Sequence, residues 1–196
     1  MVPSSASPDT AADDRRGWTA VGFLAVASMV GYFDRSLLSL LVEPVRADLG
    51  ISGTQMSLLL GFAFAVFMGA ASLPIAWLAD RYDRVKLLAI GIALWSVMTG
   101  AGAFAESFGM LFLSRIGVGI GEAVLVPVGA SLVAELLPRD KLARANAVGV
   151  VGTAIGVGLA LVLGGELIRW IGQGGLQQAG LLEGFRGWQT AFLLAA

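Results

Sequence analysis

Four charged residues lie inside long apolar stretches of this chain: Asp34 and Arg35 in the first, Arg115 and Glu122 in the fourth. Histidine and cysteine are absent from the 196 residues, so proton chemistry depends on carboxylates, and no thiolate nucleophile or disulfide is possible. Burial raises the pKa of a carboxyl group, whereas a neighbouring arginine lowers it. A buried carboxylate beside an arginine can exchange a proton while the arginine holds an anion. Asp34 and Glu122 are therefore candidates for proton coupling.

The cost of these charges predicts where they face. Each costs about 2.5–3.5 kcal/mol at the centre of a membrane helix, so four charges facing lipid would cost about 10 kcal/mol. They are expected to face a protein interior or a wet cavity instead. Arg115 and Glu122 lie about two helical turns apart and share one helix face. Asp34 and Arg35 diverge by about 100° and cannot pair with each other, so we expect one of them to meet the Arg115–Glu122 face across the bundle.

A simpler alternative stays open, in which these residues form interhelical salt bridges that take no part in transport. Ionisable groups inside a membrane are functional candidates by default, which favours the functional interpretation of Asp34 and Glu122. Arg115 lies near the outer end of its stretch, where its side chain can also extend towards the membrane surface. Its role is left undecided by the sequence.

The elements that must position these charges are membrane-spanning helices. The chain is 57% hydrophobic and 14% charged, whereas soluble domains carry about 25% charged residues. A span needs about 20 mostly apolar residues, and the stretches that meet this length are 18–42, 56–78, 87–105, 110–137 and 145–168. Residues 188–196 begin a sixth stretch that is too short to span, so we expect the chain to be truncated within that helix. The prediction is an all-α membrane protein, with 1–16 a disordered tail and 17–196 a helix bundle.

Basic residues predict the orientation of the bundle in the membrane. Eight fall on one side: Arg15, Arg16, Arg81, Arg84, Lys86, Arg139, Lys141 and Arg144. Three fall on the other side: Arg46, Arg169 and Arg186. Because cytoplasmic loops carry an excess of lysine and arginine, we expect a cytoplasmic amino terminus. In and beside the connection 169–187, Trp170 and Trp188 are typical of a membrane interface.

Glycines predict close helix packing on two of the spans. They recur at helical spacing at Gly117, Gly121, Gly149, Gly152, Gly156 and Gly164. Small faces let two helices approach closely in lipid. Static packing is favoured over a hinge, although the two are compatible in bundles that rock along tight interfaces.

The second loop carries a family signature. Residues 76–86 read AWLADRYDRVK, which resembles the pattern Gly-x-Leu-Ala-Asp-Arg-x-Gly-Arg-Arg/Lys between helices two and three of the major facilitator superfamily. Asp80, Arg81 and Arg84 fall on matching positions, whereas Ala76 and Asp83 replace the two glycines. Residues 115–123 (RIGVGIGEA) and 185–192 (FRGWQTAF) resemble the fourth-helix motif and the entry to helix six. Within the superfamily, residues 32–44 (YFDRSLLSLLVEP) most resemble the spinster-like branch.

The resemblance implies the amino-terminal six-helix half of a major facilitator fold, truncated within helix six. It implies a secondary active transporter, proton-coupled as a symporter or antiporter, that moves a lysolipid-like molecule or an organic acid by alternating access. Proton coupling would fall to Asp34 and Glu122, and substrate binding to Tyr32, Arg35 and Arg115.

The resemblance also assigns a role to the second loop. Asp80, Arg81 and Arg84 would form a cytoplasmic gate, with a latch between Asp80 and Arg84. Asp80 would also stabilise the dipole at the start of the third helix. The alternative is a loop that only fixes membrane orientation.

A second interpretation of the whole chain is a non-transporting membrane interaction protein, a half-transporter that acts only as an oligomer. An enzyme is not expected, since no His-x-x-x-His or Gly-x-Ser-x-Gly motif occurs. No cofactor and no metal are expected. The expected partners are a small-molecule or lipid-like substrate, protons, the lipid bilayer and a missing carboxy-terminal half, and nothing indicates nucleic acid. The expected location is a bacterial inner (plasma) membrane, as a multi-pass protein.

Overall fold

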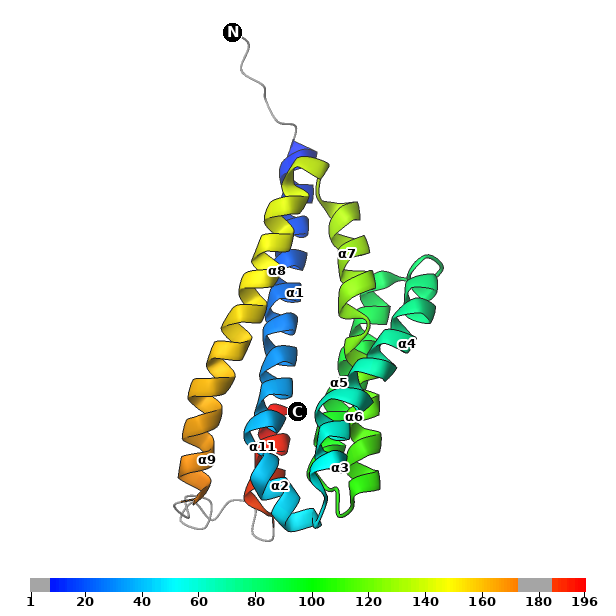
Figure 1. Cartoon of the computed structure of the whole chain (residues 1–196). Helices are drawn as coiled ribbons and strands as arrows, with labels where there is room; N and C mark the ends of the chain where they lie inside the picture. The colour runs from blue at the N-terminus through cyan, green and yellow to red at the C-terminus, as the bar shows by residue number, and fades with distance from the viewer. Residues whose placement is uncertain (1–7, 173–184) are drawn as a thin grey trace.

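The computed structural model describes residues 8–172 and 185–196 as a bundle of helices (Figure 1). No strand occurs within these residues. Helices long and apolar enough to cross a membrane cover Asp14–Leu40, Gly53–Ala79, Arg84–Ala103, Phe108–Leu136 and Arg139–Leu167. Each corresponds to one predicted span, and α11 (Gly187–Ala195) corresponds to the start of the sixth. The all-α class of membrane protein is confirmed.

The first span begins earlier than the sequence predicts. Helix α1 covers Pro8–Leu40, so residues 8–16 are helical rather than a disordered tail, and residues 1–7 lie outside the described part. Proline at the first helical position and acids in the first turns favour this start. Helix α2 (Val42–Leu49) follows at an angle. The break occurs because Pro44 has no N–H for the carbonyl of Leu40, and its ring crowds that carbonyl.

The second span contains a wider turn. It consists of α3 (Gly53–Ser57), a π-helical turn η1 (Leu58–Phe62) and α4 (Ala63–Ala79). A capping box starts it, in which Ser52 accepts from the backbone of Gln55 and the Gln55 side chain accepts from the backbone of Ser52. The third span is α5 (Arg84–Ala103), and its N-cap is Asp83, which accepts from the Lys86 N–H at 2.9 Å. The acid at the start of the third span is therefore Asp83, whereas Asp80, which was expected to stabilise the dipole there, ends α4.

The fourth span is broken directly after its buried glutamate. It consists of α6 (Phe108–Glu122) and α7 (Leu125–Leu136). Pro127 explains the break, because it cannot donate to the carbonyl of Ala123 four residues earlier. Glu122 consequently lies at the last position of α6, close to the middle of the span.

The fifth span consists of α8 (Arg139–Leu159), a second π-helical turn η2 (Ala160–Gly164) and α9 (Gly165–Gly172). Most of the connection expected at 169–187 lies outside the described residues. Trp188, at the start of α11, is buried, and its Nε1–H donates to Asp48 Oδ2 at 2.5 Å. Asp48 and the surrounding apolar side chains enclose the Trp188 ring, so the ring does not face lipid. Its position at the depth of the membrane interface stays a prediction.

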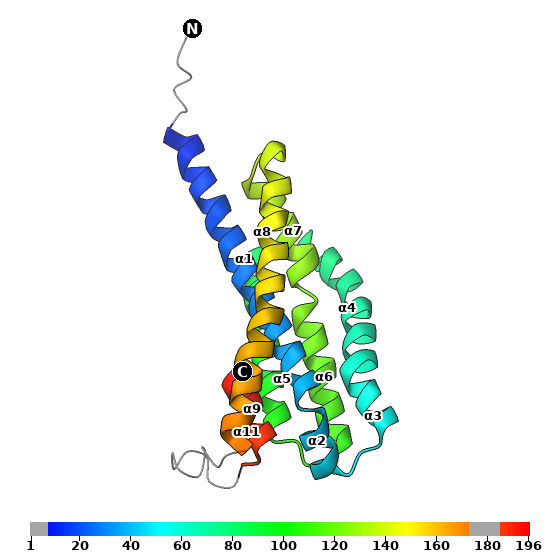
Figure 2. The same cartoon turned by 60° about the vertical axis from the view of Figure 1, so that its left-hand side comes forward.

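The helices form two groups. Helices α1 and α8 run side by side in the same direction, and α4, α5 and α6 pack together beside them (Figures 1 and 2). Helix α7 contacts α1, α4 and α5, while α11 contacts α5 and α9. The space between the two groups is where the charged residues meet.

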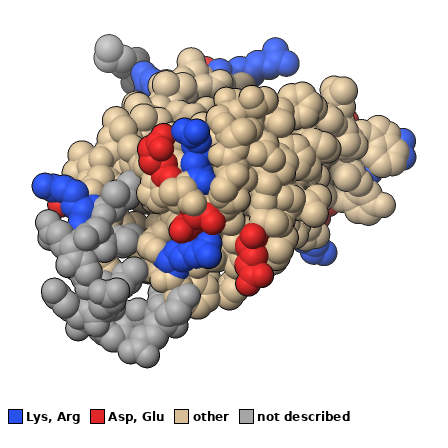
Figure 3. Space-filling model, turned by 60° about the horizontal axis from the view of Figure 1, so that its bottom comes forward, with Lys and Arg blue, Asp and Glu red and all other residues tan. Residues whose placement is uncertain are grey.

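Large apolar side chains cover the outside of the bundle as well as its core, and a few charged side chains are buried. Large apolar side chains such as Leu73, Ile90 and Leu113 are exposed, whereas Asp34 and Glu122 are buried. Seen from the lower end of Figure 1, acidic and basic side chains lie together on an otherwise mostly uncharged surface (Figure 3). This arrangement fits a lipid solvent, in which apolar side chains face outwards and charges face the interior.

Candidate functional site

Two ion pairs connect the first and fourth spans. Arg115 Nη2 on α6 donates to Asp34 Oδ2 on α1 at 2.8 Å, and both side chains are 2% exposed. Arg35 on α1 donates through Nη2 to Glu122 Oε2 on α6. The expectation that the charges of the first helix meet the Arg115–Glu122 face is confirmed. Each helix supplies one acid and one base, so the pairs cross between the helices.

Arg115 does not extend to the membrane surface, which the sequence had left open. Its guanidinium lies 5.7 Å from the centre of the Phe192 ring on α11. Phe192 belongs to a buried apolar cluster that also includes Leu41 and Leu111, and the Arg115 side chain is 2% exposed. With its route to the surface closed, Arg115 pairs with Asp34 inside the bundle.

The two pairs differ in their access to solvent. The side chain of Arg35 is 26% exposed, whereas that of its partner Glu122 is 0% exposed. Arg35 and Arg115 both line a cleft of about 200 Å³, together with Tyr32, Ser36, Leu38, Ser39, Leu59, Leu60 and Phe64. No carboxylate is among these lining residues. Asp34 and Glu122, which pair with the two arginines, do not line the cleft. The cleft therefore presents cationic and hydroxyl groups, which suits an anion.

Unused hydrogen-bonding atoms remain at the site. Glu122 Oε1 and Arg115 Nη1 are buried and have no hydrogen-bond partner among the described residues. A buried polar atom without a partner is costly and needs an explanation, such as a ligand or a change of protonation. Glu122 packs against Gly31, since a β-carbon built there would lie 3.2 Å from Glu122 Oε2. A proton on Glu122 would remove the cost of its buried charge, and an anion beside Arg115 would accept a hydrogen bond from its free Nη1.

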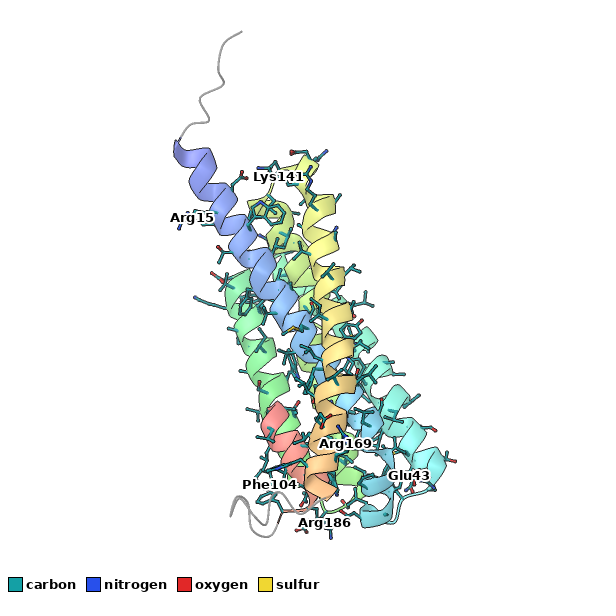
Figure 4. All side chains as sticks on the ribbon, turned by 90° about the vertical axis from the view of Figure 1, so that its left-hand side faces the viewer. Arg15, Glu43, Phe104, Lys141, Arg169 and Arg186 are labelled. Atoms are coloured by element: carbon teal, nitrogen blue, oxygen red, sulfur yellow. The ribbon has the colours of Figure 1, made fainter. Side chains whose placement is uncertain are left out.

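The second-loop residues lie away from this site, at the end of the bundle that also carries Arg15 and Lys141 (Figure 4). Arg84 forms an ion pair with Glu135 of α7 rather than a latch with Asp80. Arg81 stacks on Trp77, 3.8 Å from the ring centre. The predicted Asp80–Arg84 latch is absent from the described ion pairs, because Arg84 begins α5 beside the last turn of α7 while Asp80 is exposed at the end of α4.

The predicted glycines divide into packed and open positions. A β-carbon at Gly152 would lie 2.6 Å from the Ala25 carbonyl oxygen, and one at Gly156 would collide with the backbone of Met29. A β-carbon would also lie too close to the Leu40 side chain at Gly164 and to the Met98 side chain at Gly117. At Gly121 it would lie too close to the backbone of Gly91 and Trp95. A β-carbon at Gly149 would have no other atom within 4 Å, because Gly149 faces a hollow of about 210 Å³ between α1, α7 and α8. The packing prediction is therefore wrong for Gly149.

A larger hollow of about 680 Å³ lies elsewhere, between the start of α1 and the start of α5. Its lining is almost entirely apolar, with Arg15 and Arg16 at one rim. We place the functional site at the smaller cleft, because the buried charges gather there. Among the described residues, no group of three or more acidic side chains is arranged to hold a metal ion.

Among the cleft residues that sequence reasoning missed, Phe64 is the one whose ring contacts Arg35. It lies 4.4 Å from the Arg35 guanidinium, measured to the ring centre. It is one of many apolar residues in the second span, and no charge or motif marks it. Only the position of its ring in the folded chain identifies it.

Comparison with known proteins completes the description of the site. A family model described as Major Facilitator Superfamily matches residues 24–196. An MFS-type efflux pump of Mycolicibacterium smegmatis is 34% identical over 181 residues, which is 92% of this chain and 38% of that protein. A probable L-galactonate transporter of Escherichia coli is 33% identical over 141 residues, 70% of this chain and 31% of that protein.

A solved structure agrees with these relatives. It is the crystal structure of a bacterial homologue of the human lysosomal transporter Spinster, in an inward-facing and unoccupied conformation. Its TM-score is 0.80 at 28% identity, with 91% of this chain and 40% of that chain covered. The chain thus spans less than half the length of the relatives it matches.

Proposed function

Because the chain belongs to the major facilitator superfamily and corresponds to the amino-terminal half of a spinster-like transporter, we propose that it forms half of a proton-coupled secondary transporter. The substrate proposed is an anionic or amphipathic organic molecule, such as a sugar acid or a lysolipid, carried by alternating access. A carboxy-terminal half would supply the facing wall of the route. Its relatives are transporters, and an enzymatic role is not indicated.

The crossed ion pairs beside a cleft without carboxylates carry this proposal. Asp34, Arg35, Arg115 and Glu122 sum to zero charge when all are ionised. A proton on Glu122 would release Arg35 and leave the group with one positive charge. An anion in the cleft would then restore neutrality, so proton and anion favour each other's binding. Low net charge matters because a charge carried through a low-dielectric interior is costly.

The cleft also supports the proposed type of substrate. Arg35 and Arg115 offer guanidinium groups, which match the planar geometry of a carboxylate or the oxygens of a phosphate. Leu38, Leu59 and Leu60 supply apolar surface next to them. The name of the L-galactonate relative supports an organic acid, and the apolar lining supports an amphipathic molecule.

The proposed location is the inner membrane of a bacterium, with the amino terminus in the cytoplasm. In the structure, the regions holding the eight basic residues counted above lie at one end, where Arg15 and Lys141 are seen, and Arg169 and Arg186 lie at the opposite end (Figure 4). The excess of basic residues favours the cytoplasm for the first end.

The test is transport by the full-length protein in proteoliposomes. L-galactonate and lysophosphatidylglycerol serve as probes, and the uptake of each is measured with and without an inwardly directed proton gradient. We expect uptake of at least one probe, accelerated several-fold by the gradient. Uptake of neither probe would contradict the substrate class, and uptake that ignores the gradient would contradict proton coupling.

A further inference from the structure

We propose that Phe64 is a positioning residue that, together with Tyr32, holds the Arg35 guanidinium between two aromatic rings so that an anion meets it edge-on. The Arg35 guanidinium carbon lies 4.3 Å from the centre of the Tyr32 ring and 4.4 Å from that of Phe64. Tyr32 is one turn away on α1, whereas Phe64 comes from α4. The two rings therefore hold the group between two helices. This inference rests on the proposed function for its substrate, although not for the ring contacts themselves.

The stacking restricts how Arg35 can form hydrogen bonds. Among the described residues, Nη2 donates to Glu122, and Nε is buried without a partner. Rings over a guanidinium occupy its faces and leave its edges for hydrogen bonds. The part of the Arg35 side chain that remains exposed faces the cleft. A carboxylate or phosphate in the cleft would thus meet an oriented edge, and Arg35 would not need to lose rotamer freedom on binding.

The π-helical turn η1 lies directly before Phe64 and widens the cleft-lining face of the second span. Residues five apart in a regular α-helix lie about 140° apart and face different sides. In η1 the N–H of Ala63 bonds to the carbonyl of Leu58, five residues earlier, which brings residues five apart to the same side. Leu60, four residues before Phe64, and Leu59, five residues before it, both line the cleft together with Phe64. A movement of the second span would therefore move the Phe64 ring and change the position of the Arg35 guanidinium.

The experiment compares three variants of the full-length protein with the wild type. Phe64→Leu removes the ring but keeps an apolar side chain of similar size. Phe64→Tyr keeps a ring at this position. Phe62→Leu is the matched control, because Phe62 lies two residues earlier on the same span but is 51% exposed and absent from the cleft. The first readout is the rate at which phenylglyoxal modifies Arg35, followed by mass spectrometry. The second is the KM and maximal rate of proton-driven L-galactonate or lysophosphatidylglycerol uptake.

We expect Phe64→Leu to raise the modification rate of Arg35 several-fold and to raise KM about tenfold with little change in maximal rate. Phe64→Tyr and Phe62→Leu should behave like the wild type. An unchanged modification rate in Phe64→Leu, or an equal rise in Phe62→Leu, would overturn the inference. If the wild type transports neither probe, the proposed function fails, while the modification rates still decide whether Phe64 holds Arg35.

Discussion

Asp34 and Arg115 illustrate how a buried ion pair constrains both partners. Both side chains are almost fully enclosed, so each has lost most of its hydration and depends on the other. Removing one partner of such a pair leaves an uncompensated charge, which is more harmful than removing both. The pair is therefore expected to contribute to folding as well as to the site.

A double-mutant cycle tests this dependence. Asp34→Asn should lower stability by about 3–5 kcal/mol, because it leaves the Arg115 charge buried without a carboxylate. Adding Arg115→Gln should recover part of the loss, since no buried charge then remains. The measurement is the unfolding free energy of each variant in detergent. Two losses that simply add would show that the residues act independently.

The sequence predicted that these residues meet, but not which acid meets which base. Helical spacing places Arg115 and Glu122 on one face, and the cost of charge in lipid requires that the face be buried. The pairing depends on how far each arginine side chain reaches between α1 and α6, which no pattern encodes. The roles of Asp34 and Glu122 in proton coupling, and of Tyr32, Arg35 and Arg115 in substrate binding, stay predictions.

At the scale of elements, α1 and α8 pack closely because glycines of α8 place no side chain at the contact. Gly152 and Gly156 lie against the backbone of Ala25 and Met29. In lipid, where apolar surface gains little by leaving the solvent, such close contact is a main source of helix association. An added methyl group at these positions must push the helices apart.

Gly152→Ala and Gly149→Ala form a matched pair on the same helix. The first should lower stability by about 1–3 kcal/mol, because its β-carbon would overlap the Ala25 carbonyl oxygen. The second should stay within about 0.5 kcal/mol of the wild type, since nothing lies within 4 Å. Thermal unfolding in detergent compares them. Equal losses in the two variants would mean that the α1–α8 contact is looser than the structure has it.

Element boundaries were less predictable than the elements themselves. The apolar stretches identified all five spans, because length and hydrophobicity alone define them. The breaks after Leu40 and Glu122 follow from Pro44 and Pro127, whose effect is visible once the helix register is known. The π-helical turns η1 and η2 carry no recognisable sequence signal, so the position of Phe64 could not be predicted. Gly149 was misjudged because spacing alone cannot reveal a neighbouring hollow.

At the scale of the whole molecule, the two ends differ in their basic residues. Since the chain contains no cysteine, single cysteines report the orientation cleanly. Glu106→Cys and Asp140→Cys place one thiol at each end, both at exposed positions. A membrane-impermeant maleimide should label the first in intact spheroplasts and the second only after permeabilisation. The reverse pattern would contradict the cytoplasmic amino terminus.

The whole-molecule claim is that neutralising one buried carboxylate frees an arginine for an anion. Glu122→Gln imitates the protonated state permanently. The decisive measurement compares, in proteoliposomes of the full-length protein, exchange of the transported anion at equal pH with uptake driven by a proton gradient. We predict that Glu122→Gln keeps exchange but loses its response to the gradient, because nothing is left at that position to bind or release the proton. A gradient response equal to that of the wild type would contradict the account.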